Sequence, residues 1–169
     1  MNHIKPTIPI VLLFITSACV STSGILPEEQ ARFIPDQART IMVRSDITAD
    51  SLYRHTLRTL LRQGYRIEQK DDALHSISTG AYEIGQSTKV RYDIYIENTG
   101  SSTTARLNAD WQAGIQGNAM AEVLTGVNYE AQWDQAIWGE GGRPSRAFAQ
   151  MYKFAQGLPH RNIEFQIQP

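Results

Sequence analysis

The only thiol in the chain is Cys19, and its place near the amino terminus limits the chemistry open to it. A single cysteine forms no intramolecular disulfide and supplies neither a CxxC pair nor a thiolate zinc site. The residues before it start with the amino terminus and Lys5 as a positive end, continue with the apolar run 8–15 and finish with small residues. That three-part order is typical of a secretory signal peptide. Because the apolar run is far shorter than the roughly 20 residues that span a bilayer, the sequence predicts a removable leader over 1–18.

The end of this leader, Thr16-Ser17-Ala18-Cys19, resembles the lipobox of bacterial lipoproteins. The resemblance implies that the chain is cut before Cys19 and that this cysteine is acylated, with enough acyl chains for stable membrane anchoring. Thr16 stands where the family usually has leucine, and ordinary signal peptidase cleavage remains open because Thr16 and Ala18 also fit a small-x-small rule. Val20 is not the aspartate that retains Gram-negative lipoproteins at the inner membrane. The resemblance therefore implies a cell outer membrane location, with the protein on the periplasmic side.

The other reactive side chains form no recognisable catalytic motif. The sequence contains no H-E-x-x-H motif, no phosphate-loop glycine pattern and no G-x-S-x-G elbow. His55, His75 and His160 fall on a helix, a strand and a tail respectively. We therefore expect no metal, no cofactor and no enzyme activity. A hydrolase whose residues converge only in the fold remains open, and a cluster of His75 with Asp93 or Asp110 would support it.

The glycine-rich segment 113–143 carries Tyr129, Trp133 and Trp138. Long loops are uncommon in compact domains and often carry function, and exposed aromatic side chains anchor protein partners or stack on ligands. These three residues are the candidate interaction site. The alternative is that Trp133 and Trp138 belong to a further hairpin or short helix that closes the core.

The charge balance argues against nucleic acid as a partner. Lys and Arg total 16 against 17 for Asp and Glu, so no net field attracts a polyanion. With 169 residues, the chain without its leader fits one ordinary domain.

The elements that must position these residues follow from periodicity. Two-residue alternation predicts strands near 41–45, 65–67, 75–81, 89–97, 104–112 and 163–167. Helical spacing predicts a helix over 49–63 with Thr48 as its cap, and a second helix from Pro144 to Gly157. This order predicts an α+β two-layer sandwich, a mostly antiparallel sheet with two helices on one face and a polar face open to water. Open sheet edges are expected near Thr40 or Ile163.

Residues 20–39 contain Pro27 and Pro35 without sustained periodicity, which predicts an extended tether. The chain is therefore expected to divide into a signal peptide, a lipidated cysteine with a flexible tether, and a single α+β domain, at 1–18, 19–39 and 40–169.

The stretch 41–111 resembles a known domain through its leucine-rich helix, its Gly64-Tyr65-Arg66-Ile67 exit and its Asp71-Asp72 hairpin. It is similar to the helix-grip domain, related in shape to the TATA-box-binding protein, of the C-subunit lipoprotein of the outer-membrane β-barrel assembly machinery. The resemblance implies a shape, since function does not follow from a shared fold.

Two function classes lead. The first is a membrane-anchored periplasmic lipoprotein whose domain binds another envelope protein, or assists envelope assembly, through its polar sheet face or its aromatic segment. The alternative is a glycan, peptidoglycan or small-ligand binding module in which Tyr129, Trp133 and Trp138 stack on the ligand.

Overall fold

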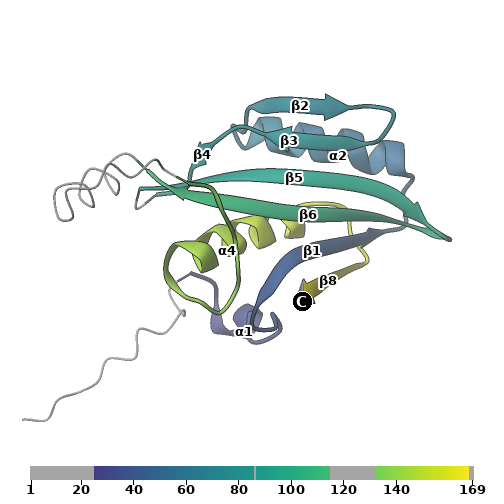
Figure 1. Ribbon diagram of the computed structural model, residues 1–169. Helices are drawn as coiled ribbons and strands as arrows, with labels where there is room; N and C mark the ends of the chain where they lie inside the picture. The colour runs from purple at the N-terminus through teal and green to yellow at the C-terminus, as the bar shows by residue number, and fades with distance from the viewer. Residues whose placement is uncertain (1–24, 86, 115–131, 168–169) are drawn as a thin grey trace, which may run out of the picture.

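The computed structural model describes residues 25–85, 87–114 and 132–167, which form one antiparallel sheet with helices against it (Figure 1). Within these residues the sheet has eight strands: β1 (Ala38–Ser45), β2 (Ile67–Asp71), β3 (Ser76–Thr79), β4 (Tyr82–Glu83), β5 (Thr88–Thr99), β6 (Ser102–Ala113), β7 (Asp134–Gln135) and β8 (Asn162–Ile167). The described helices are α1 (Glu28–Ala31), α2 (Ala49–Arg62) and α4 (Gly142–Gln156). The strand order is β2-β3-β5-β6-β1-β8, with β4 paired to β5 and β7 paired to β6. The predicted α+β class is confirmed.

Helices α2 and α4 pack against the same face of the sheet and lie behind it in Figure 1. The strand side chains on this covered face are apolar and buried, namely Val90, Tyr92, Ile94, Ile96, Ala105, Leu107 and Ala109. They occupy alternate positions of the two longest strands, β5 and β6. Because side chains of a strand alternate between its two faces, the intervening polar residues point away from the helices.

Helix α2 begins and ends where the sequence predicts, to within a residue. The Thr48 hydroxyl accepts a hydrogen bond of 3.3 Å from the Ser51 backbone N–H, which caps the first turn. At the other end Gly64 adopts a φ of +83°, and the Tyr65 backbone N–H donates to the Leu60 carbonyl. This is the Schellman arrangement that a left-handed glycine permits. It turns Tyr65 back toward the sheet.

Residues 25–39 are not an extended tether, and the predicted domain boundary at 40 is wrong. Leu26 and Ile34 are only 2% and 4% exposed, and the Gln37 backbone N–H donates to the Trp138 carbonyl over 2.9 Å. The four-residue helix α1 lies between them. A helix this short owes its stability to tertiary contacts rather than to its own propensity, so it leaves no periodicity in the sequence. Residues 19–24 lie outside the described residues.

The two ends of the sheet correct one of the predicted edges. Strand β1 pairs with β6 on one side and β8 on the other, so Thr40 lies inside the sheet. Strand β8 is the outer strand at that end, which confirms the edge near Ile163. Among the described ranges no helix has the length and apolar character needed to cross a bilayer.

Candidate functional sites

The first candidate site is the open face, by which we mean the side of β5 and β6 turned away from α2 and α4. Its side chains form two adjacent rows, Lys89, Arg91, Asp93, Tyr95 and Glu97 on β5, and Thr104, Arg106, Asn108, Asp110 and Gln112 on β6. Both charge signs are present in each row. The polar face predicted from the sequence is therefore confirmed.

Tyr95 lies near the middle of the open face and is 52% exposed. Its cross-strand neighbours are Arg106 on β6 and Ser76 on β3. Arg106 is exposed as well. Tyr and Arg are the residue types enriched at the energetic centres of protein interfaces, and here they stand opposite each other.

Ion pairs flank this centre on both sides. The Arg91 guanidinium donates from Nε and Nη2 to Asp110 Oδ2 at 3.0 and 2.8 Å. On the other side, Arg44 Nε lies 2.8 Å from Glu164 Oε1. Within each pair the two opposite charges neutralise each other. Tyr95 and Arg106, which lie between the pairs, remain available to contact a partner.

Trp133 also lies on the open face. The next two residues form β7, in which Gln135 pairs with Asp110 and Asp134 pairs with Trp111. The Arg91 guanidinium carbon is 4.6 Å from the centroid of the Trp133 ring, a cation–π contact. The half-buried indole therefore already has a cation over its face, and stacking on a ligand would have to displace Arg91.

Trp138 is not an exposed anchor, and that prediction is wrong. Its side chain is 4% exposed and its ring lies 6.1 Å from that of Phe148 on α4. Its backbone N–H donates to the Ala38 carbonyl over 2.9 Å. This hydrogen bond attaches the chain around Trp138 to the first residue of β1. The core-closing alternative holds for Trp138. Tyr129 and Cys19 lie outside the described residues.

The structure keeps the suggested catalytic residues in separate environments. His75 packs against Tyr53 with ring centroids 5.3 Å apart, Asp93 accepts a 2.6 Å hydrogen bond from Ser78, and Asp110 is bound by Arg91. In the part of the chain that the structure describes, no group of three or more His, Cys, Asp or Glu residues is placed to hold a metal ion.

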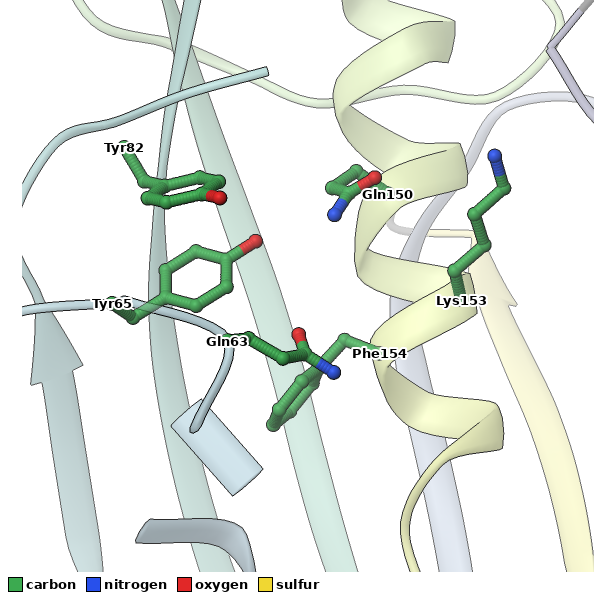
Figure 2. A pocket seen from close by; sticks show the side chains of 6 residues that line it. All are labelled: Gln63, Tyr65, Tyr82, Gln150, Lys153 and Phe154. Carbon is green, nitrogen blue, oxygen red and sulfur yellow. The ribbon is translucent and has the colours of Figure 1, made fainter. Parts of the chain in front are cut away.

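The second candidate site is a cleft between the end of α2 and helix α4, with a volume of about 260 Å³. We call it the tyrosine cleft; it is lined by Gln63, Tyr65, Tyr82, Gln150, Lys153 and Phe154. Figure 2 shows Tyr65 and Tyr82 reaching toward the side of α4 that carries Gln150, whereas Lys153 lies on the other side of this helix and points away from the two rings. Strand β4 places Tyr82 there, because its partner Val90 faces the helices.

The tyrosines of the cleft form a stack that continues into the core. Tyr65 lies 4.3 Å from Tyr82 and 5.0 Å from Tyr92, measured between ring centroids. The hydroxyls of Tyr65 and Tyr92 are 2.9 Å apart and share a hydrogen bond. Burial raises the pKa of Tyr65 and raises the pKa of Tyr92 well above its usual value. Both phenols therefore stay protonated at neutral pH and hold the floor of the cleft in place.

Sequence reasoning missed both the Tyr95 centre and the cleft. A signal for Tyr95 existed, because it is an aromatic residue in the polar row of a strongly alternating strand. No comparable signal existed for the cleft, because Tyr65, Tyr82 and Gln150 meet only through the order of the strands and the placement of α4.

Comparison with protein-family models gives no match for this chain, and comparison with curated proteins gives none either.

Proposed function

We propose that this chain is a lipoprotein anchored through acylated Cys19 to the periplasmic side of the outer membrane, and that its domain binds another envelope protein through the open face. The proposal needs no enzyme activity and no cofactor. It assigns the helices and the core to stability, and the open face to recognition.

The observation that carries the proposal is the exposed pair of Tyr95 and Arg106 at the centre of a face that the helices leave uncovered. A tyrosine of this kind offers a large contact area at little cost in conformational entropy. Arg106 adds a planar guanidinium group, which can donate two parallel hydrogen bonds to one carboxylate. The partner surface that fits is therefore one with a depression for the Tyr95 ring and an acidic side chain within reach of Arg106.

The anchor supports the choice of an envelope partner. A lipobox-like sequence ends at the single cysteine, and a protein held at a membrane surface meets its membrane neighbours at high effective concentration. Even a modest interface on the open face then gives substantial occupancy.

The anchor is tested by replacing Cys19 with alanine in the full chain. We expect the native protein to incorporate labelled fatty acid and to fractionate with outer membranes, and the Cys19→Ala protein to do neither. Unchanged mass and membrane fractionation in the variant would remove the lipoprotein assignment.

The interface is tested by placing a photo-crosslinking amino acid at position 95 or 106 in cells. A matched control is Leu61, which is 61% exposed but lies on the outer side of α2. We expect one envelope protein to be crosslinked from 95 and 106 and not from 61, and Arg106→Glu to abolish its copurification. The same adducts from all three positions would contradict binding through the open face.

A glycan site built from Tyr129, Trp133 and Trp138 is not proposed. Trp138 is buried in the core and the Trp133 ring faces Arg91, so these two indoles form no common platform.

A further inference from the structure

Strand β8 forms one outer edge of the sheet, next to β1 (Figure 1). Among the described residues, no strand pairs with the other side of β8. A strand at a sheet edge offers its unpaired N–H and C=O groups to any further strand that fits. Which strand fits β8 follows from the direction of these backbone groups and from the side chains between them.

The backbone hydrogen bonds around β8 show which of its residues point to the free side. The Arg161 N–H donates to the Arg44 carbonyl over 2.8 Å, so this carbonyl is directed toward β8. Asn162 lies opposite Arg44, and in an antiparallel pair every second pair of opposite residues exchanges hydrogen bonds. Asn162 therefore bonds β1, and so do the alternate residues 164 and 166. The backbone groups left at the free edge are those of Ile163, Phe165 and Ile167.

The side chains of the same three residues form an incomplete apolar row on the helix side of the sheet. The ring of Phe165 lies 5.6 Å from that of Tyr152 and 6.3 Å from that of Phe148, measured between centroids. Ile163 also packs against the core, yet it stays partly exposed, as Phe165 does. Ile167 is 55% exposed. A further strand with apolar residues at the matching positions would complete this row.

The opposite edge of the sheet is protected against such pairing. There β2 carries the exposed charges of Glu68 and Lys70, and its pairing with β3 has a register shift. Charged side chains and bulges are the usual protection of sheet edges. Strand β8 has one charged residue, Glu164, whose carboxylate is already paired with Arg44 at 2.8 Å. Of the two edges, β8 is therefore the one suited to accept another strand.

We propose that β8 pairs antiparallel with β8 of a second copy of this chain, about a two-fold axis through Phe165. In this register the opposite pairs are Phe165 with the partner's Phe165, Ile163 with the partner's Ile167, and Glu164 with the partner's Gln166. The backbone groups at the free edge of one copy meet those of the other, and opposite residues exchange hydrogen bonds. Ile167 gains an apolar neighbour, and the apolar row continues from one core into the next.

The sequence of β8 selects this register and a second copy as its occupant. An axis through Glu164 would place two carboxylates opposite each other, and like charges in that arrangement are destabilising. An axis between Glu164 and Phe165 would set polar side chains against the apolar row. An axis through Gln166 would leave Ile163 opposite no residue of β8. About Phe165, apolar residues meet apolar ones and a carboxylate meets an amide, which is the self-complementarity that a two-fold contact requires.

This pairing has a consequence for the shape of the dimer. A two-fold axis that joins two edge strands antiparallel is perpendicular to the sheet, so the helices of both copies lie on the same side. Both open faces then point in the same direction, and the dimer presents two pairs of Tyr95 and Arg106 side by side. Formation of the dimer depends neither on binding through the open face nor on the lipid anchor, so its test is independent of both.

The first test measures the mass of the full-length protein in detergent micelles by sedimentation equilibrium over a range of protein concentrations. We expect a reversible dimer. Gln166 is exposed, so its substitutions leave the fold intact. Gln166→Lys places a cation opposite the partner's Glu164 and is expected to strengthen the dimer, whereas Gln166→Glu places a like charge there and is expected to weaken it. Because each pair occurs twice, we expect the dissociation constant to change roughly tenfold in each direction.

The matched control is Gln69, an exposed glutamine on β2 at the opposite edge. Gln69→Lys and Gln69→Glu are expected to leave the dissociation constant unchanged. A monomer at every concentration would overturn the proposal. So would equal dissociation constants for the two variants of Gln166.

The second test locates the axis by thiol crosslinking in a full chain that carries Cys19→Ala, so that the introduced thiol is the only one. Residues that exchange hydrogen bonds across two strands have Cα atoms about 5.5 Å apart, within the range of about 4.4–6.8 Å for disulfides. With a mild oxidant, Phe165→Cys is expected to give covalent dimers and Ile163→Cys none. Ile163→Cys combined with Ile167→Cys is expected to give them again.

Equal crosslinking from 163 and 165 would contradict the axis through Phe165. In cells, a disulfide from 165 to a different envelope protein in place of a second copy would overturn the dimer and assign the edge to that protein. If Phe165→Cys does not fold, the two variants of the exposed Gln166 still decide.

Discussion

The two faces of the β5–β6 hairpin are made from alternate residues of the same two strands, yet their surroundings differ completely. On the covered face Tyr92 is fully buried, and its hydroxyl bonds that of Tyr65. Three residues further along, on the open face, Tyr95 is 52% exposed beside Arg106. Since the side-chain period of a strand is two, one step along the chain moves a residue from the core to the surface. The difference teaches that residue type alone does not tell a core tyrosine from a binding tyrosine.

The sharpest test of this comparison uses the two tryptophans. Trp138 packs on Phe148 within the core, whereas Trp133 lies on the open face under Arg91. Replacing a buried tryptophan with alanine costs about 3–5 kcal/mol, so we expect Trp138→Ala to lower the free energy of unfolding by that amount. Trp133→Ala loses a cation–π contact worth about 0.5–1 kcal/mol at an exposed site. Urea unfolding followed by circular dichroism measures both, and equal losses would mean that the two faces are not energetically distinct.

The strands of the open face and Trp138 show how much of the burial pattern could be predicted from the sequence. Strong alternation correctly predicts which residues of β5 and β6 face the helices, because buried and more exposed residues alternate along most of these two long strands. Trp138 lies outside any such repeat. It enters the core through two backbone hydrogen bonds, from its N–H to Ala38 and from Gln37 to its carbonyl. Contacts between segments about 100 positions apart leave no local pattern, so the tryptophan appears exposed in a sequence-based interpretation.

Short elements escaped prediction for a related reason. Strands β4 and β7 have two residues each and α1 has four. Elements of this size owe their conformation to a neighbour, as β4 does to β5. The tyrosine cleft depends on β4 for Tyr82, so it could not be predicted without the strand order. The open face depends only on long strands, and its existence was predicted, although Tyr95 was not singled out.

The second prediction compares the two tyrosine hydroxyls. Tyr92→Phe removes one partner of a buried hydrogen bond, which costs about 1–3 kcal/mol when a buried group loses its partner. Tyr95→Phe changes an exposed hydroxyl, and surface substitutions usually stay within about 0.5 kcal/mol. Urea midpoints of the two variants measure the difference. A larger loss for Tyr95→Phe would show that the open face is part of the folded core.

A third prediction concerns the ion pair on the open face. Asp110→Asn removes the charge that Arg91 binds, and the two side chains are 40% and 28% exposed. Partly exposed ion pairs contribute about 0–1 kcal/mol, so we expect a small loss that shrinks further in high salt. Thermal melts at low and high salt measure it. A loss that does not depend on salt would mean that Asp110 acts through packing rather than charge.

The smallest effect is expected where α2 meets the edge of the sheet. The Tyr53 hydroxyl donates a 2.7 Å hydrogen bond to Asp72 at the β2–β3 turn. Burial of the ring, followed by the hydrogen bond and the negative charge of Asp72, raises the pKa of Tyr53 from 10.0 to about 12. The folded state thus favours the protonated phenol. Its contribution to stability is complete below pH 10 and is lost as the pH rises through about 12.

The same hydrogen bond acts with the opposite sign on its acceptor. It is the main cause that holds the pKa of Asp72 below the usual 3.8, so the folded state favours the ionised carboxylate. That contribution is present above pH 3.8 and is lost as the pH falls through the lowered pKa. Tyr53→Phe is therefore expected to flatten both the alkaline and the acid arms of the stability profile and to lower the stability between them, by a small amount because the Asp72 side chain is 69% exposed. Thermal melts across the pH range measure this, with Tyr95→Phe as the control that keeps both arms. If Tyr53→Phe kept the native pH dependence of stability at both acid and alkaline pH, the Tyr53 hydroxyl and Asp72 would not be coupled. The hydroxyl of Tyr53 would then contribute no more to stability than the exposed hydroxyl of Tyr95.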